Sequence, residues 1–565
     1  MDFQPFNQSP PRLGNQFDDD RALKNLLRRL LPVEVYSAIE PELRELGELS
    51  GGELYEDMLR ERLLEPELTQ WGAWGERVDE IELTPLWKKA QELAARFGVV
   101  AAGYEDRFGE FARVHQFALV HLFAPSTDVY SCPLAMTDGA AKTLLTSGNQ
   151  KLIGRALPRL TSRDPATFWT SGQWMTESTG GSDVGRSETV AVHEEGARYR
   201  LYGRKWFTSA TTSEMTLTLA RPEGNGPGGR GLALFYVELR DENGKLQRIE
   251  INRLKDKLGT RKVPTAELML RGTPAELVTD EARDGIRNIS PMLNITRTWN
   301  TVSAVSFMRR GIALAQDYAK RRVAFSAPLS EKPLHAETLS SLVAEYEAAL
   351  VLAFEVIATI GRIEHQRTEP NDEALLRILT PLAKLVTGKQ AVSVVTEAIE
   401  AFGGAGYIED TGLPTLLRDT HVLPIWEGTT NVLSLDVIKT LSRDPSLGEQ
   451  LLERFDDRTA GLAHAEMKRL ASQARATLEK ALLWAKDRAM NAPLELEAGA
   501  RHFSLTLGRS FALGLLAAQA EYSMSKFGDK LSLVSARRFA LERFDFIRET
   551  SVNESLALAN DLLSE

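Results

Sequence analysis

The stretch that decides how this chain is interpreted runs Phe402-Gly403-Gly404-Ala405-Gly406-Tyr407, then Arg418-Asp419, then Ile425-Trp426-Glu427-Gly428-Thr429-Thr430-Asn431. A glycine cluster ends a long apolar helical pattern, and a lone carboxylate follows between an aromatic residue and a glycine. Apolar helical spacing resumes after Asn431, so Glu427 is predicted on a tight turn beside a helix N-terminus, where backbone N–H groups bind anions. Glu427 is the candidate catalytic base. The competing interpretation of Glu427 is that it caps the following helix. The competing interpretation of Gly403 and Gly404 is that they form a helix C-cap.

Helical patterns extend outward from this stretch on both sides. Three long apolar stripes predict an antiparallel bundle, at Asn294 to Val323, Ala336 to Glu364 and Leu382 to Phe402. A further helical segment is predicted from Arg443 to Glu565, with breaks near Pro493 and Gly528. Helical patterns also dominate from Asp18 to about Leu160, after a turn-rich arm that covers the first 17 residues.

Between Thr167 and Leu270 the residues alternate as they do in half-buried strands. Thr189 to Tyr202 predicts a hairpin that turns at Glu194-Glu195-Gly196. Met215 to Leu219 and Leu232 to Val237 predict two strands around the glycine-rich loop at Asn225, and Ala266 to Leu270 predicts another. This region is predicted to form a small β-barrel or sandwich.

Bulk properties exclude several classes of protein. A chain of 565 residues needs more than one domain, and its apolar fraction of 43% is ordinary for a soluble protein. The net charge of -10 argues against a protein that coats nucleic acid or an anionic membrane over its whole surface. The single cysteine, Cys132, excludes an internal disulfide framework and a thiolate metal cluster, and predicts a cytoplasmic setting; no metal site is expected. The sequence shows neither a secretory signal nor an apolar run long enough to span a bilayer.

Three stretches outside the opening one carry residues suited to chemistry. Met175 to Asp183 is rich in small polar residues that suit a ligand-gripping loop, although a plain turn between strands is favoured when the stretch is taken alone. Trp206 and Thr208 are two apart on a strand, so one could stack on a planar cofactor while the other hydrogen-bonds it; a core aromatic explains Trp206 equally well. Arg322 closes a long helix, either capping it or meeting a phosphate.

Taken jointly and in order, these motifs resemble the flavin-dependent acyl-CoA dehydrogenases over about residues 90 to 440. The chain is most similar to the AidB-type branch of that family. The shared features are Cys132-Pro133-Leu134 with Met136-Thr137, the run Lys255-Asp256-Lys257-Leu258-Gly259, Thr296-Arg297, Trp426 before the candidate base, and the helical extension after Arg443.

The resemblance implies an α+β multidomain fold of the acyl-CoA dehydrogenase type. Its predicted parts are an N-terminal arm (1–40), an N-terminal helical domain (41–165), a central β-barrel (166–282), a helical bundle with the catalytic glutamate (283–442) and an extra C-terminal helical domain (443–565). The resemblance also implies FAD as cofactor. It assigns FAD contacts to Gln173, Met175, Thr176, Gly181, Ser182, Trp206, Thr208, Arg322, Phe325, Gly403, Gly404, Thr429 and Asn431, with Arg322 and Phe325 reaching a neighbouring subunit. Arg297, Ser182 and Gly428 are the implied substrate contacts. For Arg297 a solvated arginine at a helix start is an equal alternative.

Four positions depart from the family pattern. Ser178 stands where a proline is usual, Ser326 where a glycine is usual, and Glu400 and Asn431 each stand where a glutamine is usual. An acid near the adenosine-pyrophosphate half of FAD is unfavourable, so contacts by Gly403 and Gly404 are better supported than one by Glu400.

The implied reaction is α,β-dehydrogenation of a fatty acyl-CoA of medium or long, or branched, chain. Glu427 would remove the α-proton, with the β-hydride passing to flavin N5, and Gly428 permits the close approach. A homotetramer, with an electron-transfer flavoprotein as a candidate partner, is implied by the family alone. Two alternatives stay open: an AidB-like flavoprotein that binds and protects DNA, and a protein that holds acyl-CoA without turning it over. The basic candidates for DNA contact are Arg501, Arg509, Lys526, Lys530, Arg537, Arg538 and Arg543, although they alternate with acids.

Overall fold

The fold is that of a computed structural model, which describes residues 6–549 and 551–563. The first five residues of the predicted N-terminal arm therefore lie outside the described residues. The chain forms two compact units. The barrel unit comprises Glu45–Arg107 and His115–Trp299, and the helical unit comprises the residues up to Arg44, Phe108–Val114 and Asn300 onward.

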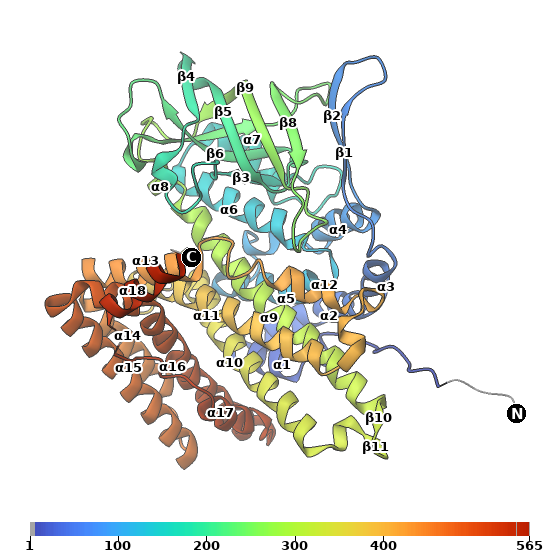
Figure 1. Cartoon of the computed structure of the whole chain (residues 1–565), viewed down its shortest axis with the longest axis vertical. Coiled ribbons are helices and arrows are strands. Elements are labelled where there is room, and N and C mark those ends of the chain that lie inside the picture. Colours follow the sequence, from blue (N-terminus) through green and yellow to red (C-terminus); the bar gives the residue numbers. More distant parts are fainter. Residues whose placement is uncertain (1–5, 550, 564–565) are drawn as a thin grey trace, which may run out of the picture. The chain divides into compact units, whose positions relative to one another are not determined.

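The barrel unit is built on one seven-stranded sheet (Figure 1). Its strands are β3 (Ser171–Trp174), β4 (Val190–Glu195), β5 (Arg198–Thr208), β6 (Met215–Pro222), β7 (Ala233–Glu238), β8 (Ile249–Leu254) and β9 (Ala266–Leu277). The pairings β6–β4, β4–β5, β5–β9, β9–β7 and β7–β6 close a ring, while β3 pairs with β6 and β8 pairs with β9. The predicted barrel is thus confirmed, including the hairpin of β4 and β5. Its core is made by inward residues such as Trp174, Leu201, Phe235 and Leu268.

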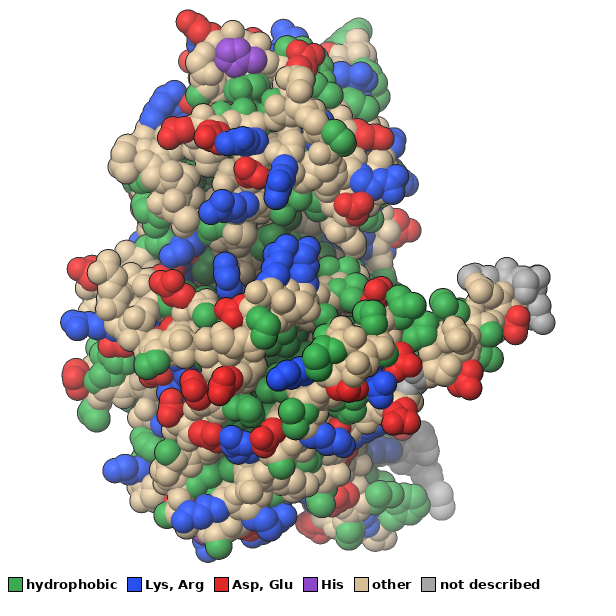
Figure 2. All heavy atoms as spheres, turned by 90° about the vertical axis from the view of Figure 1, so that its left-hand side faces the viewer, with side chains coloured by type: hydrophobic (Ala, Val, Ile, Leu, Met, Phe, Trp, Pro, Cys, Tyr) green, Lys and Arg blue, Asp and Glu red, His purple; other side chains and the backbone are tan. Residues whose placement is uncertain are grey.

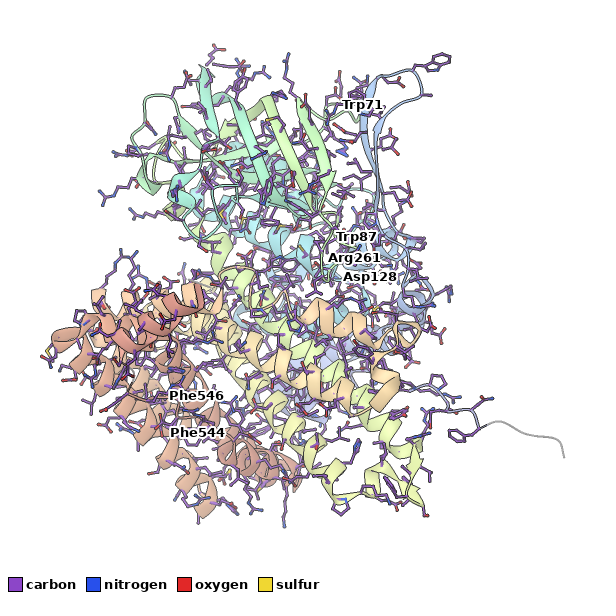
Figure 3. All side chains as sticks on the ribbon, in the orientation of Figure 1. Trp71, Trp87, Asp128, Arg261, Phe544 and Phe546 are labelled. Atoms are coloured by element: carbon purple, nitrogen blue, oxygen red, sulfur yellow. The ribbon has the colours of Figure 1, made fainter. Side chains whose placement is uncertain are left out.

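A second, two-stranded sheet is a departure from the helical region predicted before Leu160. β1 (Glu67–Trp71) and β2 (Arg77–Glu82) form a hairpin, joined to the barrel where the side chains of Gln70 and Arg77 donate to the Ile251 carbonyl at 2.8 and 2.9 Å. Trp71 lies on this hairpin, which protrudes beside β8 (Figures 1 and 3). Both strands are short and mostly exposed, so they lack the apolar stripe that would have predicted them.

Helices complete the barrel unit. They are α3 (Glu53–Arg60), α4 (Pro85–Arg96), most of α5 (Ala112–Phe123), α6 (Ser131–Ser147), α7 (Gln150–Leu160) and α8 (Gly285–Asn288). α2 (Val33–Gly51) and α9 (Ser290–Arg321) each have residues in both units. Apart from the β1–β2 hairpin, the mainly helical character predicted between Asp18 and Leu160 is confirmed. Thr84 caps α4, because its hydroxyl accepts from the Trp87 N–H, and Pro85 occupies the first turn.

The helical unit contains α1 (Arg21–Leu30), α10 (Pro333–Glu364), α11 (Asp372–Glu400), α12 (Leu413–Thr420), α13 (Thr430–Arg443), α14 (Ser446–Thr459), α15 (Ala465–Asn491), α16 (Pro493–Phe527), α17 (Leu531–Leu541) and α18 (Val552–Leu563). A small hairpin, β10 (Val323–Ala324) with β11 (Ala327–Pro328), follows α9. The predicted breaks are confirmed: Pro493 begins α16, and Gly528 ends it in a left-handed conformation with φ +65°. α11 begins ten residues before the predicted start: the buried Leu375, Ile378 and Leu379 extend the same apolar stripe toward the N-terminus, past Pro381 inside the helix.

A buried ion-pair network joins the C-terminal extension to the bundle. Arg454 on α14 donates to Asp372 at the start of α11 at 2.8 Å, and Arg458 donates to Glu355 on α10 at 3.0 Å. Arg362 also donates to Asp372, at 2.9 Å. Asp372, Glu355 and Arg454 are all buried, so each charge is stabilised by these partners rather than by water. No helix among the described residues is both long and apolar enough to cross a membrane.

Candidate functional site

The candidate flavin loop follows β3 in the barrel unit and is held by its own backbone. The Thr176 carbonyl accepts from the Trp206 N–H at 3.0 Å, which ties the start of the loop to β5. Gly180 has φ +128° and donates to the Glu177 carbonyl at 3.0 Å, closing a tight turn. A Cβ at Gly181 would lie 3.0 Å from the Thr176 hydroxyl oxygen, so a small residue is needed there. Ser182 is exposed beside it.

Beneath this loop is a buried ion pair that sequence reasoning missed. Lys205 and Glu177 lie 2.8 Å apart, with side chains 0% and 3% exposed. Glu177 also accepts from the Thr189 hydroxyl at 2.6 Å and the Glu188 N–H at 2.6 Å, and Lys205 donates to the Leu219 carbonyl at 2.7 Å. Burial raises the pKa of Glu177, but the charge and hydrogen bond of Lys205 outweigh burial, so the pKa is lowered. The pair fastens the loop to the strand that carries Trp206.

Trp206 lies at an irregularity in β5, where the register with β9 shifts between Lys205 and Thr208. Such a bulge re-aims the side chains around it. The Lys255 ammonium lies 3.4 Å from the centre of the Trp206 ring, and the Arg204 guanidinium carbon lies 5.0 Å from it. Thr208 is buried, and its hydroxyl donates to the Ala266 carbonyl at 2.7 Å, so only its oxygen lone pairs are left for a ligand.

An unpaired hydrogen-bond acceptor indicates that a polar cofactor fits the surface formed by the loop, Gln173 and Trp206. The buried Oε1 of Gln173 has no hydrogen-bond partner among the described residues. A buried acceptor without a donor is costly, and a ligand N–H or O–H at that position would relieve the cost. Together with the half-buried Trp206 ring, this makes the loop, Gln173 and Trp206 suited to hold FAD. Met175 and Thr176, both half-buried, lie in the same loop.

The candidate base lies on a strained turn in the helical unit. Glu427 has φ +58°, an unfavourable conformation for a residue with a Cβ, and Gly428 follows with φ +108°. Glycine is favoured at 428, because side chains rarely adopt that φ and a Cβ there would lie 3.0 Å from the Leu433 side chain. Thr429 caps α13, because its hydroxyl accepts from the Val432 N–H at 3.4 Å. The capping position is therefore filled by Thr429 and not by Glu427, which is half-buried, while Asn431 is exposed on the first turn.

A second buried lysine stands behind this turn, and it too was missed from the sequence. Lys384 on α11 is 0% exposed, and its ammonium donates to the Gly428 carbonyl at 2.6 Å. The available signal was a charge inside the apolar run Leu382-Ala383-Lys384-Leu385-Val386. Such a charge is rarely buried without a specific partner.

The other predicted contacts in the helical unit lie at helix ends. Gly403 lies three residues beyond the end of α11, has φ +59° and begins a short 3-10 helix (Gly403–Tyr407), and the space around both Gly403 and Gly404 is open. Glu400, the last residue of α11, is exposed. Phe325 lies at the tip of the β10–β11 hairpin and is 92% exposed.

Arg322 ends α9 with two contacts from the N-terminal segment: the Gln8 side-chain oxygen at 3.5 Å and the Phe6 ring, whose centre is 5.5 Å away. Arg297 is half-buried in the first half of α9. Within the barrel unit the structure thus gathers the flavin loop, Gln173 and Trp206, and within the helical unit it gathers Glu427, Gly428 and Thr429.

Comparisons with known proteins show the family to which the chain belongs. The chain matches the family models for the AidB N-terminal domain at residues 7–165, the acyl-CoA dehydrogenase middle domain at 172–273 and the acyl-CoA dehydrogenase C-terminal domain at 283–442. Acyl-CoA dehydrogenase family member 11 of Caenorhabditis elegans is 43% identical over 95% of this chain and 89% of its own length. The AidB protein of Escherichia coli, a putative acyl-CoA dehydrogenase, is 32% identical over 69% of this chain and 72% of its own length.

Solved structures give the same result. The crystal structure of the Caenorhabditis elegans protein ACDH-11 in complex with C11-CoA superposes with a TM-score of 0.91 at 40% identity, covering 100% of this chain and 97% of that one. An acyl-CoA dehydrogenase from Bacillus anthracis complexed with FAD shares the fold, with a TM-score of 0.69 at 19% identity over 84% of this chain and 85% of that one.

These matches define the chain as a flavin-dependent oxidoreductase. The chain belongs to the acyl-CoA dehydrogenase family, whose cofactor is FAD, and within it to the AidB-type branch with a C-terminal helical extension.

Proposed function

We propose that this protein catalyses α,β-dehydrogenation of a fatty acyl-CoA of medium or long, or branched, chain, with Glu427 as the base. The observation that carries the proposal is the turn at Glu427: its backbone is held in a left-handed conformation and is followed by a glycine with φ +108°, at the start of α13. Strain of this kind persists where the surroundings over-determine it, commonly at reactive sites. The complex of its relative ACDH-11 with C11-CoA supports an acyl-CoA of this class as the ligand.

In the proposed mechanism the residues of this chain hold the thioester and move one proton. The Glu427 carboxylate removes a proton from the α-carbon, and its own backbone N–H donates to the thioester carbonyl, which stabilises the negative charge that develops on the carbonyl oxygen. Gly428 lets the thioester approach the backbone closely. Bound FAD would supply the acceptor for the hydride that leaves the β-carbon. The proposed FAD contacts come from both units. In the barrel unit they are Gln173, Met175, Thr176, Gly181, Ser182, Trp206 and Thr208. In the helical unit they are Arg322, Phe325, Gly403, Gly404, Thr429 and Asn431.

The remaining assignments rest on the family resemblance. Arg297, Ser182 and Gly428 are the proposed substrate contacts. The proposed assembly is a cytoplasmic homotetramer that passes electrons to an electron-transfer flavoprotein, and the five-part division of the chain stays a prediction.

The test is anaerobic titration of the FAD-loaded protein with saturated acyl-CoAs of graded length, following the loss of flavin absorbance. We expect bleaching that is fastest with chains of medium or greater length, and Glu427→Gln should abolish it while FAD stays bound. If tight acyl-CoA binding occurs without bleaching at any length, the protein sequesters its ligand and the dehydrogenase proposal is wrong. Full bleaching by Glu427→Gln would remove the assignment of the base.

A further inference from the structure

The face of α11 that is directed at the Glu427 turn carries two unusual positions one helical turn apart. Lys384 is fully buried, and Gly388 lies four residues later, so both residues lie on the same face of the helix. Neither residue type is expected at such a place: a buried lysine costs desolvation, and a glycine inside a helix lowers helix stability by about 1 kcal/mol relative to alanine. Each position therefore calls for an explanation in what it contacts.

The two positions contact opposite ends of one short segment, residues 423–428. A Cβ at Gly388 would lie 3.3 Å from both the Leu423 carbonyl oxygen and the Pro424 nitrogen, so the helix packs directly against the backbone there. Lys384 donates to the Gly428 carbonyl at 2.6 Å at the other end. Between these anchors the Ile425 and Trp426 N–H groups both donate to the Val422 carbonyl, at 2.8 and 2.9 Å. The left-handed Glu427 thus lies in a segment that is fixed at both ends.

We infer that Lys384 and Gly388 are positioning residues for the proposed base, Glu427, and that Lys384 acts through its hydrogen bond to the Gly428 carbonyl. This inference rests on the proposed function. The peptide between Gly428 and Thr429 is oriented by the ammonium group, and that orientation sets both the cap of α13 and the direction in which the preceding glutamate leaves the turn. Loss of the donor leaves the Gly428 carbonyl without its buried partner and releases Glu427 from its strained conformation.

A purely structural role makes a different prediction. If Lys384 only fills the core, its replacement by methionine should change the stability of the protein. It should not lower the rate of proton abstraction selectively while substrate affinity is kept. A positioning residue lowers the rate of the chemical step while leaving ground-state binding nearly unchanged, because a misplacement of about 1 Å costs about 100-fold in rate.

The experiment compares Lys384→Met, Lys384→Arg and Gly388→Ala in the FAD-loaded protein. Lys389→Met is the control, because it removes the half-buried lysine of the same helix that has no hydrogen bond or ion pair among the described residues. Three quantities are measured: FAD content, the affinity for a 3-thia-acyl-CoA, and the exchange of its α-protons with D2O by NMR. Sulfur replaces the β-carbon of this probe, so no hydride can leave and proton abstraction is observed separately from flavin reduction.

We expect Lys384→Met to slow α-proton exchange by about 100-fold with FAD content and probe affinity retained. Lys384→Arg should restore most of the exchange, Gly388→Ala should slow it, and Lys389→Met should match the wild type. Wild-type exchange in Lys384→Met would overturn the inference. If that variant does not fold, wild-type exchange in a folded Gly388→Ala or Lys384→Gln would overturn it instead. The variant Glu427→Gln separates the two proposals. If α-proton exchange survives in Glu427→Gln, the assignment of Glu427 as the base is wrong. If exchange is lost in Glu427→Gln but intact in Lys384→Met, only the inference about Lys384 is wrong.

Discussion

At the scale of single residues, each unit contains a fully buried lysine next to its candidate site residues. Lys205 lies behind the flavin loop and is paired with a carboxylate, whereas Lys384 lies behind the Glu427 turn and donates to a backbone carbonyl. Burial lowers the pKa of Lys205, and the charge and hydrogen bond of Glu177 offset this lowering only in part. The cost of burying these charges suggests that each stabilises a specific loop geometry rather than the fold in general.

Replacing Lys205 by methionine should therefore destabilise the protein and loosen FAD. It leaves Glu177 buried without its partner, which costs about 3–5 kcal/mol. We expect a lower denaturation midpoint and faster FAD release, measured by urea unfolding and by flavin fluorescence. The double variant Lys205→Met with Glu177→Leu removes both charges and should recover part of the stability. If the single variant has wild-type stability and FAD retention, the pair does not hold the loop.

At the scale of secondary-structure elements, charge pairs rather than apolar contacts alone join α14 to α10 and α11. Burial raises the pKa of Glu355, but the charge and hydrogen bond of Arg458 outweigh burial and the pKa is lowered. Burial likewise raises the pKa of Asp372, and the hydrogen bonds from Arg362, the Glu369 N–H and Arg454 lower it overall. Both carboxylates are therefore charged in the folded protein at neutral pH and hydrogen-bonded to arginines.

This network predicts a stability that is lost in acid. A carboxylate whose pKa is lowered on folding contributes stability above its unfolded pKa of about 4, and that contribution disappears as the pH falls through the folded value. The thermal midpoint should therefore decline below about pH 5. Arg454→Met should lower the midpoint at neutral pH and flatten its decline in acid, as followed by circular dichroism. An identical pH dependence in wild type and variant would show that the network is not responsible.

At the scale of the whole molecule, the charge distribution bears on the alternative of DNA binding. Three of the seven basic candidates are already paired: Arg509 with Glu345 at 2.7 Å, Arg537 with Glu466 at 2.6 Å and Arg538 with Glu337 at 2.5 Å. Figure 2, which faces the C-terminal helices, shows Lys and Arg side chains interspersed with Asp and Glu. Phe544 and Phe546 lie beside those helices (Figure 3), and the Phe546 N–H donates to the hydroxyl of Thr506 on α16 at 2.9 Å.

We therefore expect the full-length protein to show no retention of duplex DNA at about 150 mM salt, because affinity without a basic stripe falls steeply as salt rises. The measurement is fluorescence anisotropy of a labelled duplex over a range of salt concentrations. Binding at physiological salt that is weakened by Arg501→Ala or Arg543→Ala, but not by replacement of the paired Arg537, would favour the DNA-binding alternative.

The sequence by itself determined the class of fold and the candidate base. The change from a period of 3.6 to a period of 2 near Thr167, and back after Asp284, marks where the barrel begins and ends, because burial on one face imposes those periods locally. Pro493 and Gly528 marked helix ends for the same local reason: one lacks an N–H and the other tolerates a left-handed backbone.

Only the tertiary structure decided what lies behind the site. The partners Glu177 and Lys205 are 28 residues apart, and Lys384 and Gly428 are 44 apart. Their contacts depend on how strands pair and helices pack, and the local periodicity of the sequence predicts neither. The left-handed φ of Glu427 is likewise imposed by α11 and α13 around it, since nothing in a glutamate favours that conformation. The sequence identified Glu427 as the candidate base, and the packing of α11 against residues 423–428 determines how its turn is held.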